Sequence, residues 1–298
     1  MQFVFKLKFF FLSILLILIY FLKGDILLIN LLIHKLIIIF IVGVSLSLSG
    51  LILQNILKNP LVEPYILGIS SASALGFVIS IILNFNIFLT NALMLFFIFM
   101  CYVLIISNYG NSLKFILIGI SINLICSSLI NLLMAISKQD IFKTIFILWG
   151  NLDRILTKNE ILFLYICLIV VVFSLIWIYF NRKKLLLLSL SDEESLSLGL
   201  ELKKYKRVFI TISFILVSIS VYFAGIIGFV GLIVPHISKI LNKDNYSFVI
   251  FDCVNISLIL LILAQLLLKF LNFSLPIGII TSLIGAPFFV LLLIRYLR

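Results

Sequence analysis

The chain has 298 residues, of which 64% are hydrophobic and 11% are charged, and its mean hydropathy is +1.37. A soluble domain is about 45–50% apolar and about 25% charged, so this composition excludes a water-soluble globular fold and indicates an integral membrane protein. The formal net charge of +11 comes from basic residues scattered over short segments between apolar runs, which argues against nucleic-acid binding.

The chain begins with an apolar run that imitates a signal peptide. Lys6 and Lys8 precede an apolar stretch from Phe9 to Leu22, but Lys23-Gly24-Asp25 follows where an A-x-A-like cleavage site would stand. We therefore expect a retained first helix whose two lysines reach to the membrane interface.

A membrane-spanning helix needs about 20 apolar residues, and the uncharged intervals supply further candidates in chain order. They are Leu36–Leu57; two helices within Pro64–Leu113, divided at Asn84–Asn91; Phe115–Ser137; Ile161–Asn181; two within Val208–Ser238, divided near Gly225–Gly231; Cys253–Leu268; and a last helix from about Pro276 to Ile294. The sequence thus predicts an all-α, polytopic membrane protein of about ten helices that forms one transmembrane domain, residues 1–298.

Charge placement predicts the orientation of these helices. If ten spans are drawn with the N-terminus inside, 15 of the 22 lysines and arginines fall on the inner side and 7 on the outer side. Cytoplasmic segments of membrane proteins carry such an excess. We therefore expect both termini to be cytoplasmic.

Residues 185–207 form the longest inner segment and are too polar to cross a membrane. Within them, Ser191-Asp192-Glu193-Glu194 has the S-x-x-E pattern of a capping box, and its acids lie in the first turn, where the helix dipole favours them. Gly199 suits the C-terminal end of such a helix. We expect a short helix over about 192–198 at the inner membrane face; a solvated connecting loop is the alternative.

The sequence predicts no catalytic residue, no metal site and no cofactor bound by this chain. It contains no G-x-x-x-x-G-K-[ST], so ATP would be used by another subunit, and it contains no H-E-x-x-H. His34 and His236 are isolated, and the four cysteines lie inside apolar stretches without C-x-x-C spacing. Glu160 and Asp252 fall near predicted helix ends, where we expect interface positions. Few acids are thus left for an ion-coupled carrier.

Small and neutral polar residues form the stronger signal. Gly43, Ser47 and Gly50 share one helix face, and glycines recur every three residues from 225 to 231. Such residues either let helices pack closely in lipid or form a polar, neutral wall of a pathway, and both readings stay open here. The candidate pathway residues are Ser47, Gly50, Gln54, Gly68, Ser70, Ser71, Ser73, Gly225, Gly228 and Gly231.

Several long stretches resemble motifs of one transporter family. They are SGLILQNILKNPLVEPYILGISSASALG, AGIIGFVGLIVPHISKIL, LPIGIITSLIGAPFFVLLL, LLSLSDEESLSLGL and the LWGN at 148–151. In this order they resemble the FecCD-type permeases, which are the membrane subunits of bacterial ABC importers for iron-siderophores, haem and cobalamin. The resemblance extends over about residues 36–298.

The resemblance implies ten helices per subunit and a dimer of permeases, here expected to be a homodimer, around a central pathway in the bacterial cytoplasmic (inner) membrane. Its other partners would be membrane lipid, two cytoplasmic ATPase subunits and an extracytoplasmic substrate-binding protein. The cargo expected first is an iron-siderophore or haem, moved by alternating access; a cobalamin importer is the alternative. The residues implied to seat in the ATPase are Ser191, Asp192, Glu193, Glu194, Leu198 and Gly199.

The sequence departs from the family at its expected docking surface for the binding protein. Where relatives often carry R-L-P-R, this chain has Leu32-Ile33-His34-Lys35, and the arginine before the last helix is replaced by Lys269. Because lysine lacks the bidentate fork of arginine, docking through Lys35 and Lys269 would be weaker or would use other contacts. An ion-coupled secondary carrier and a membrane enzyme are the remaining hypotheses, and both lack the residues that they need.

Overall fold

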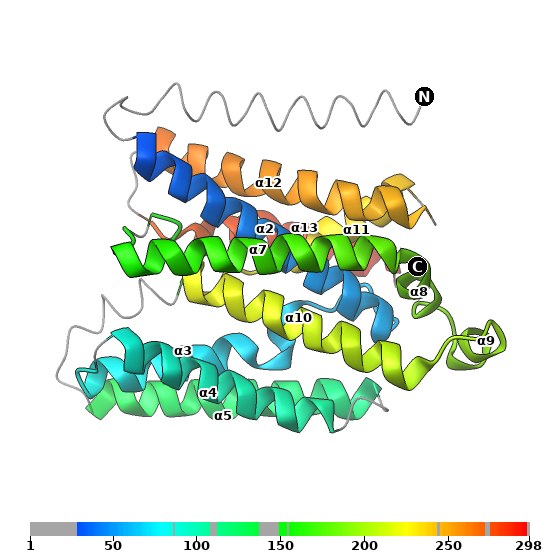
Figure 1. Cartoon of the computed structure of the whole chain (residues 1–298), viewed down its shortest axis with the longest axis horizontal. Helices are drawn as coiled ribbons and strands as arrows, with labels where there is room; N and C mark the ends of the chain where they lie inside the picture. Colours follow the sequence, from blue (N-terminus) through cyan, green and yellow to red (C-terminus); the bar gives the residue numbers. More distant parts are fainter. Residues whose placement is uncertain are drawn as a thin grey trace.

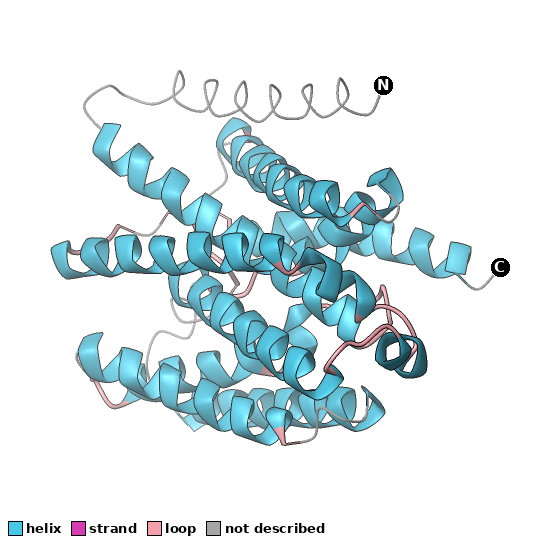
Figure 2. Cartoon of the chain, turned by 45° about the vertical axis from the view of Figure 1, so that its right-hand side comes forward, coloured by secondary structure: helices cyan, strands magenta, loops and turns pink. Residues whose placement is uncertain are grey.

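A computed structural model describes residues 29–85, 87–107, 112–136, 149–153, 155–242, 245–271 and 275–296. These residues form eleven α-helices and one 3₁₀ helix, and no strand occurs among them (Figure 2). The expected N-terminal helix lies outside the described residues. The all-α prediction is therefore confirmed for the described part of the chain.

The helices follow one another with short connections and run side by side in a bundle (Figure 1). In chain order they are α2 (Ile29–Ile56), η2 (Pro64–Leu67), α3 (Ile69–Ile82), α4 (Ile87–Ile106), α5 (Ser112–Ile136), α7 (Lys158–Phe180), α8 (Arg182–Leu187), α9 (Asp192–Ser197), α10 (Leu202–Ala224), α11 (Val230–Asn242), α12 (Tyr246–Phe270) and α13 (Ile277–Tyr296). Every predicted span after the first thus corresponds to a helix.

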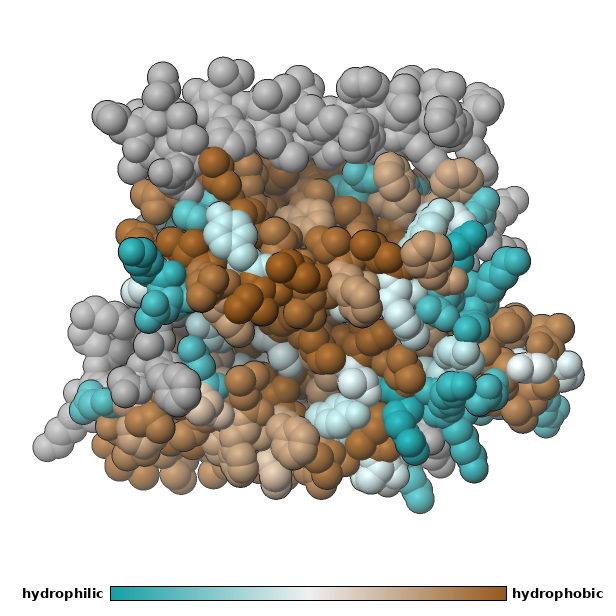
Figure 3. Space-filling model, in the orientation of Figure 1, coloured by the Kyte–Doolittle hydropathy of each residue, from teal (hydrophilic) through white to brown (hydrophobic). Residues whose placement is uncertain are grey.

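Six of these helices are long and apolar enough to cross a membrane: α2, α4, α5, α7, α10 and α12. Three shorter apolar helices, α3, α11 and α13, complete the set that the sequence predicts. Large apolar side chains cover much of the outer surface, as expected where helices face lipid (Figure 3). The total of ten spans and the side on which the termini lie stay predictions.

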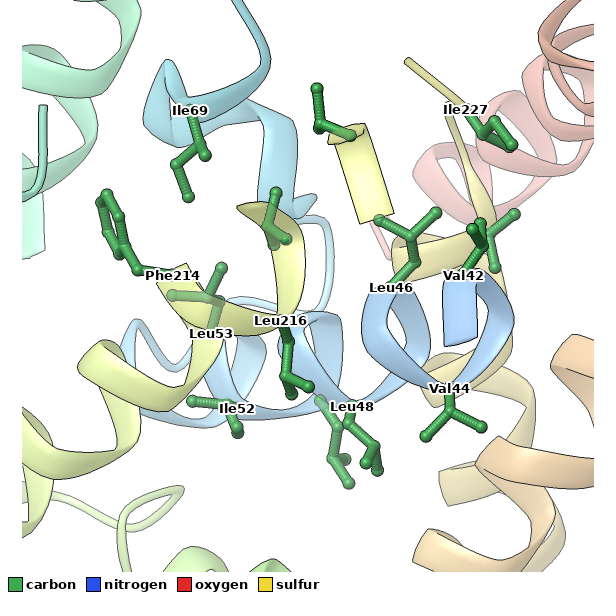
Figure 4. Close-up of a cluster of buried hydrophobic side chains, with 14 of the residues drawn as sticks. Val42, Val44, Leu46, Leu48, Ile52, Leu53, Ile69, Phe214, Leu216 and Ile227 are labelled. Carbon is green, nitrogen blue, oxygen red and sulfur yellow. The ribbon is translucent and has the colours of Figure 1, made fainter. Parts of the chain in front are cut away.

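Helix α2 lies at the centre of the bundle and packs against α7, α10, α11 and α12. Its apolar residues point in all directions, which is the pattern of a helix buried on every side. Figure 4 shows Val44, Leu48 and Ile52 of α2 in the cluster that they form with Leu216 of α10. The position of α2 matters for function, because the contacts described below join it to both ends of the molecule.

The predicted start of the helix at Cys253 is wrong, because α12 begins at Tyr246. Asp252 therefore lies in the second turn of α12 and its side chain is buried, while its position relative to the membrane interface stays a prediction. The helix passes through this acid because Asn242, the last residue of α11, donates a hydrogen bond to the Asp252 carboxylate. Glu160, by contrast, lies in the first turn of α7, near a helix end as predicted, although it is buried there.

Candidate coupling and translocation site

The short helix α9 forms at the predicted place because its first turn caps itself. The Ser191 hydroxyl accepts a hydrogen bond from the Glu194 N–H at 3.2 Å, and the Glu194 carboxylate accepts one from the Ser191 N–H at 2.9 Å. These two bonds are the predicted capping box. Gly199 follows with φ +79°, the left-handed conformation that ends a helix most easily at glycine.

Helix α9 has acidic residues in its first turn and exposes apolar side chains near its end. Leu196 and Leu198 are exposed, whereas Ser195 is buried and donates hydrogen bonds to the carbonyls of Leu187 and Ser191. The helix protrudes from one end of the bundle, beyond α8 (Figure 1). A protruding helix with exposed leucines has the form of a docking element for another protein.

Asp192 joins α9 to two other helices, and the sequence did not reveal this. Its carboxylate lies 2.5 Å from the Lys58 ammonium, just after the end of α2, and 2.9 Å from the Lys206 ammonium in the first turns of α10. Partial burial on its own would raise the pKa of Asp192, but the hydrogen bonds and charges of the two lysines outweigh it and lower the pKa. Asp192 is therefore held as an anion between α2 and α10.

A second connection joins the segment before α9 to the core. The Asn55 amide of α2 donates a hydrogen bond to the Leu185 carbonyl of α8 at 3.0 Å, and its oxygen accepts one from the Tyr246 hydroxyl of α12 at 3.1 Å. Asn55 is fully buried. A movement of α8 and α9 would therefore be passed to α2, α10 and α12 at once.

The end of α10 leads into a break in the helical structure. Ala224 ends α10, α11 begins at Val230, and the residues between them are not helical, as the sequence predicts. The Glu63 carboxylate accepts a hydrogen bond from the N–H of Phe229, and the Tyr65 hydroxyl accepts one from the Ile227 N–H at 3.0 Å. Backbone groups that are freed at membrane depth need such partners.

Gln54 lies where α2 crosses α11. Pro235 has no N–H, so the Gly231 carbonyl one turn earlier loses its helical donor. The Gln54 amide lies 3.4 Å from that carbonyl and 3.2 Å from the Leu232 carbonyl, and its oxygen accepts from the Lys239 ammonium at 3.3 Å. Gln54 thus satisfies a carbonyl that the proline leaves free.

Glycines bring the backbones together at the same crossing. A Cβ on Gly50 would overlap the backbone carbonyl of Gly231, and a Cβ on Gly231 would stand 2.5 Å from the Pro64 ring. Ser47, one turn before Gly50, is buried and donates to the Val44 carbonyl. These predicted pathway residues lie together, and in the single chain they are packed between helices.

A second group of predicted pathway residues lies where α3 meets α5. Gly68 caps α3 with φ +75°, and a Cβ there would stand 2.7 Å from the Ile122 side chain. Ser71 donates to the Asn123 side chain at 2.6 Å, and Asn123 donates in turn to the Tyr65 carbonyl at 2.9 Å. Ser70 is buried beside them in the first turn of α3.

Two of the remaining three predicted pathway residues line a cavity, and the third is in ordinary contact with its neighbours. Ser73 and Gly225 line a cavity of about 410 Å³ between α3, α4 and the end of α10. The nearest neighbours of a Cβ on Gly228 would be Glu63 at 3.7 Å and Ser282 at 3.8 Å, which is ordinary contact. Of the ten residues, Ser73 and Gly225 thus line the cavity, and the others lie against neighbouring side chains or backbone.

The two lysines predicted to dock the binding protein lie in different surroundings. Lys35 forms an ion pair with Asp153, and Gln265 of α12 donates to the same carboxylate at 2.8 Å. Lys269 lies in the last turn of α12. Lys35 is therefore already part of an internal network at the end of the bundle opposite α9.

Within the described ranges, no three His, Cys, Asp or Glu side chains come together in a way that could hold a metal ion. Cys101, Cys126, Cys167 and Cys253 are buried as free thiols. His236 packs edge-on against Phe288, with ring centroids 6.3 Å apart.

Comparison with known proteins matches nearly the whole chain to one family. Residues 7–295 match the FecCD transport family. The vitamin B12 import system permease protein BtuC of Klebsiella pneumoniae is 28% identical over 269 residues, 86% of this chain and 79% of that protein. BtuC of Salmonella typhimurium is 28% identical over 272 residues, 87% of this chain and 81% of that protein.

Two solved structures share the fold. One is described as an inward-facing conformation of a metal-chelate type ABC transporter; it superposes with a TM-score of 0.89 at 27% identity, over 99% of this chain and all of that one. The other, PsaBC from Streptococcus pneumoniae in complex with Fab, has a TM-score of 0.64 at 20% identity over 92% of this chain and 93% of that one, which speaks for the fold alone.

Proposed function

The chain belongs to the FecCD transport family, and we propose on that basis that it imports a metal chelate across a bacterial cytoplasmic membrane. It is a permease subunit of an ABC transporter and not an enzyme, since ATP is hydrolysed by a separate subunit. The observation that carries the proposed cargo class is the full-length similarity to a metal-chelate type ABC transporter. An ion-coupled carrier loses its support, because this family uses ATP.

The proposed mechanism is alternating access driven through α9. ATPase subunits hold the exposed Leu196 and Leu198, and their closure displaces α9. The displacement reaches α2 and α10 through Asp192. At its other end α10 leads to the break at 225–229, where Glu63 and Tyr65 hold the backbone. Rocking of the helices about this break would open the pathway to one side at a time.

The ten predicted pathway residues are proposed to act in two ways. The packed glycines and serines keep neighbouring helices in close contact while they rock, because small residues let backbones approach each other. The two that line the cavity, Ser73 and Gly225, contribute to a neutral wall. None of the ten side chains is charged, so the wall would pass a bulky chelate without holding it.

Which chelate the transporter carries is proposed here from the names of its relatives. The residues favour no cargo, and the expectation of an iron-siderophore or haem ahead of cobalamin gains no support from the relatives' names. The BtuC relatives are vitamin B12 permeases at 28% identity, so their names favour a corrinoid, the cargo that the sequence analysis gave as the alternative. All three are metal chelates, and a binding protein outside the membrane would select among them.

The test is to purify the tagged chain from its native membranes in mild detergent and to identify its partners by mass. We expect a P-loop ATPase, an extracytoplasmic binding protein and two permease copies per complex. The captured binding protein is then titrated with cobalamin, haem and a ferric siderophore. Tight binding of one of them names the cargo; binding of none, or recovery of the permease without an ATPase, contradicts the proposal.

Docking of the binding protein is proposed to involve Lys35 and Lys269. A Lys35→Glu, Lys269→Glu double variant reverses two charges, and at low salt it should weaken binding-protein affinity, because attraction between charges is least screened there. The change at Lys35 also breaks its ion pair with Asp153. Lys158→Glu, a charge reversal at the exposed start of α7, is the matched control. Equal affinity of the double variant and the control would exclude the two lysines from the interface.

A further inference from the structure

The end of α7 beside α8 carries a group of cations next to aromatic rings. We call it the basic corner and define it by Tyr179, Arg182, Lys183, Lys184 and Tyr205. Both rings belong to helices that are long and apolar enough to cross a membrane, α7 and α10, and the three cations lie on the first turn of α8. In Figure 3, hydrophilic residues gather at the end of the bundle that carries α8 and the start of α10.

Two cations of the corner, Arg182 and Lys184, are each held in place by an aromatic ring and a hydrogen bond. The Arg182 guanidinium lies 4.7 Å from the centre of the Tyr179 ring and donates to the Tyr179 carbonyl at 3.0 Å. The Lys184 ammonium lies 4.4 Å from the centre of the Tyr205 ring and donates to the Asn181 oxygen at 3.0 Å. Cation–π contacts of this kind fix a charge in position while most of its N–H donors stay available.

Among the residues that the structure describes, no acid forms an ion pair with the cations of the corner, Arg182, Lys183 and Lys184. The acids nearby are engaged elsewhere: Asp192 with Lys58 and Lys206, and Glu201 with Lys204 at 3.4 Å. The corner therefore presents three positive charges to whatever faces it.

The surroundings of the corner favour lipid over a protein partner. The last turns of α7 expose Phe173, Ile176 and Phe180, so the corner continues an apolar face of a spanning helix. Aromatic residues with cations just beyond them mark the headgroup level of a bilayer. Helix α9, which has the form of a protein-docking element, protrudes beyond α8 and is a separate surface (Figure 1).

We propose that the basic corner binds the phosphate of an anionic phospholipid headgroup, with the acyl chains lying along α7. Arg182 supplies the planar fork that matches phosphate oxygens, and Lys183 and Lys184 supply point charges beside it. The site depends on α7 crossing a membrane and not on the cargo of the transporter, so it can be tested without knowledge of the cargo.

The protein's two tryptophans provide the assay. Trp177 lies in the last turn of α7, packed on Phe209, and Trp149 can be replaced in a Trp149→Phe background. The full-length chain is reconstituted into vesicles that contain brominated phosphatidylglycerol or brominated phosphatidylcholine, and quenching of Trp177 gives the relative affinity of the two lipids. We expect phosphatidylglycerol to be preferred at low salt and less preferred at high salt.

The decisive variant is Arg182→Gln, Lys183→Gln, Lys184→Gln. One cation near an anionic surface strengthens binding about fivefold, so loss of three should lower the preference for phosphatidylglycerol at least fivefold. Lys158→Gln, at the other end of α7, is the matched control and should keep the preference. Unchanged quenching by brominated phosphatidylcholine shows that the variant is folded.

Three results would overturn the proposal. If both brominated lipids quench Trp177 equally in the unmutated protein, the corner has no preference for an anionic headgroup, and its cations only set the orientation of the protein in the membrane. An equal loss in Lys158→Gln would mean that any cation at the surface has the same effect. A triple variant that keeps its lipid preference but loses the ATPase subunit on purification would assign the corner to the protein interface.

Discussion

Asp192 holds α9 against two other helices, and we predict that its replacement by asparagine loosens α9. The change leaves Lys206, whose side chain is 9% exposed, without its carboxylate. Removal of one partner from a fully buried pair costs about 3–5 kcal/mol, and an exposed pair contributes about 0–1 kcal/mol. Asp192 itself is 49% exposed, so solvent screens the pair. We expect a loss of about 1–2 kcal/mol, or a 5–30-fold rise in the undocked population of α9.

Amide hydrogen exchange in the purified chain measures this directly, because α9 amides exchange when the helix undocks. Residues 193–197 should exchange about 5–30-fold faster in Asp192→Asn. Glu193→Gln is the matched control, since it removes a neighbouring exposed charge and should change exchange little. Uptake per ATP hydrolysed in the assembled transporter should fall in the first variant and not in the second.

The pH dependence of this protection has a defined sign. The pKa of Asp192 is lowered in the folded chain. Its pairing therefore stabilises the folded state above the unfolded pKa of about 3.9 and is lost as the pH falls through the folded pKa. Protection of α9 should fall in this acidic range in the unmutated chain, and the fall should be smaller in Asp192→Asn, where only the capping carboxylate of Glu194, whose pKa is also lowered, still titrates. Equal protection of Asp192→Asn and Glu193→Gln at neutral pH would refute the reasoning.

Three further predictions concern the core and the end of α9. Gly50→Ala should destabilise the chain by several kcal/mol and lower its thermal midpoint in detergent, because the new Cβ meets the rigid backbone of Gly231. Gln54→Leu should cost about 1–3 kcal/mol by the same measurement, since a buried carbonyl loses its donor, and Pro235→Ala should return part of this loss. Gly199→Pro should abolish uptake with membrane insertion intact, because proline cannot adopt φ +79°.

Each of these has an outcome that contradicts it. A Gly50→Ala chain with an unchanged midpoint would mean that α2 and α11 are farther apart than described. Strict additivity of Gln54→Leu and Pro235→Ala would show that the amide does not serve the carbonyl freed by the proline. Normal uptake by Gly199→Pro would remove the 192–198 segment from coupling. Gly199→Ala, where a Cβ meets nothing within 4 Å, is the milder control.

Features that depend on neighbouring residues were predictable from the sequence. The capping box of α9 involves Ser191 and Glu194, three residues apart, and the break after Ala224 was expected because residues 208–238 are too long for one helix and carry closely spaced glycines. Helix starts set by distant contacts were not predictable. The start of α12 was placed too late because Asp252 looked like a boundary, whereas in the folded chain Asp252 is buried and accepts a hydrogen bond from Asn242.

The sequence by itself determined that this is a membrane protein of apolar helices with a polar, capped segment on one side, because composition and short-range spacing decide these properties. Only the tertiary structure decided which helices the capped segment touches. Lys58 lies 134 residues from Asp192, and nothing in either stretch specifies the other. Likewise Gly50 and Gly231 fit a pathway wall or a close crossing equally well as sequence patterns. In the folded chain the two glycines form a close crossing, because α2 lies directly against α11, and their part in a pathway stays a prediction.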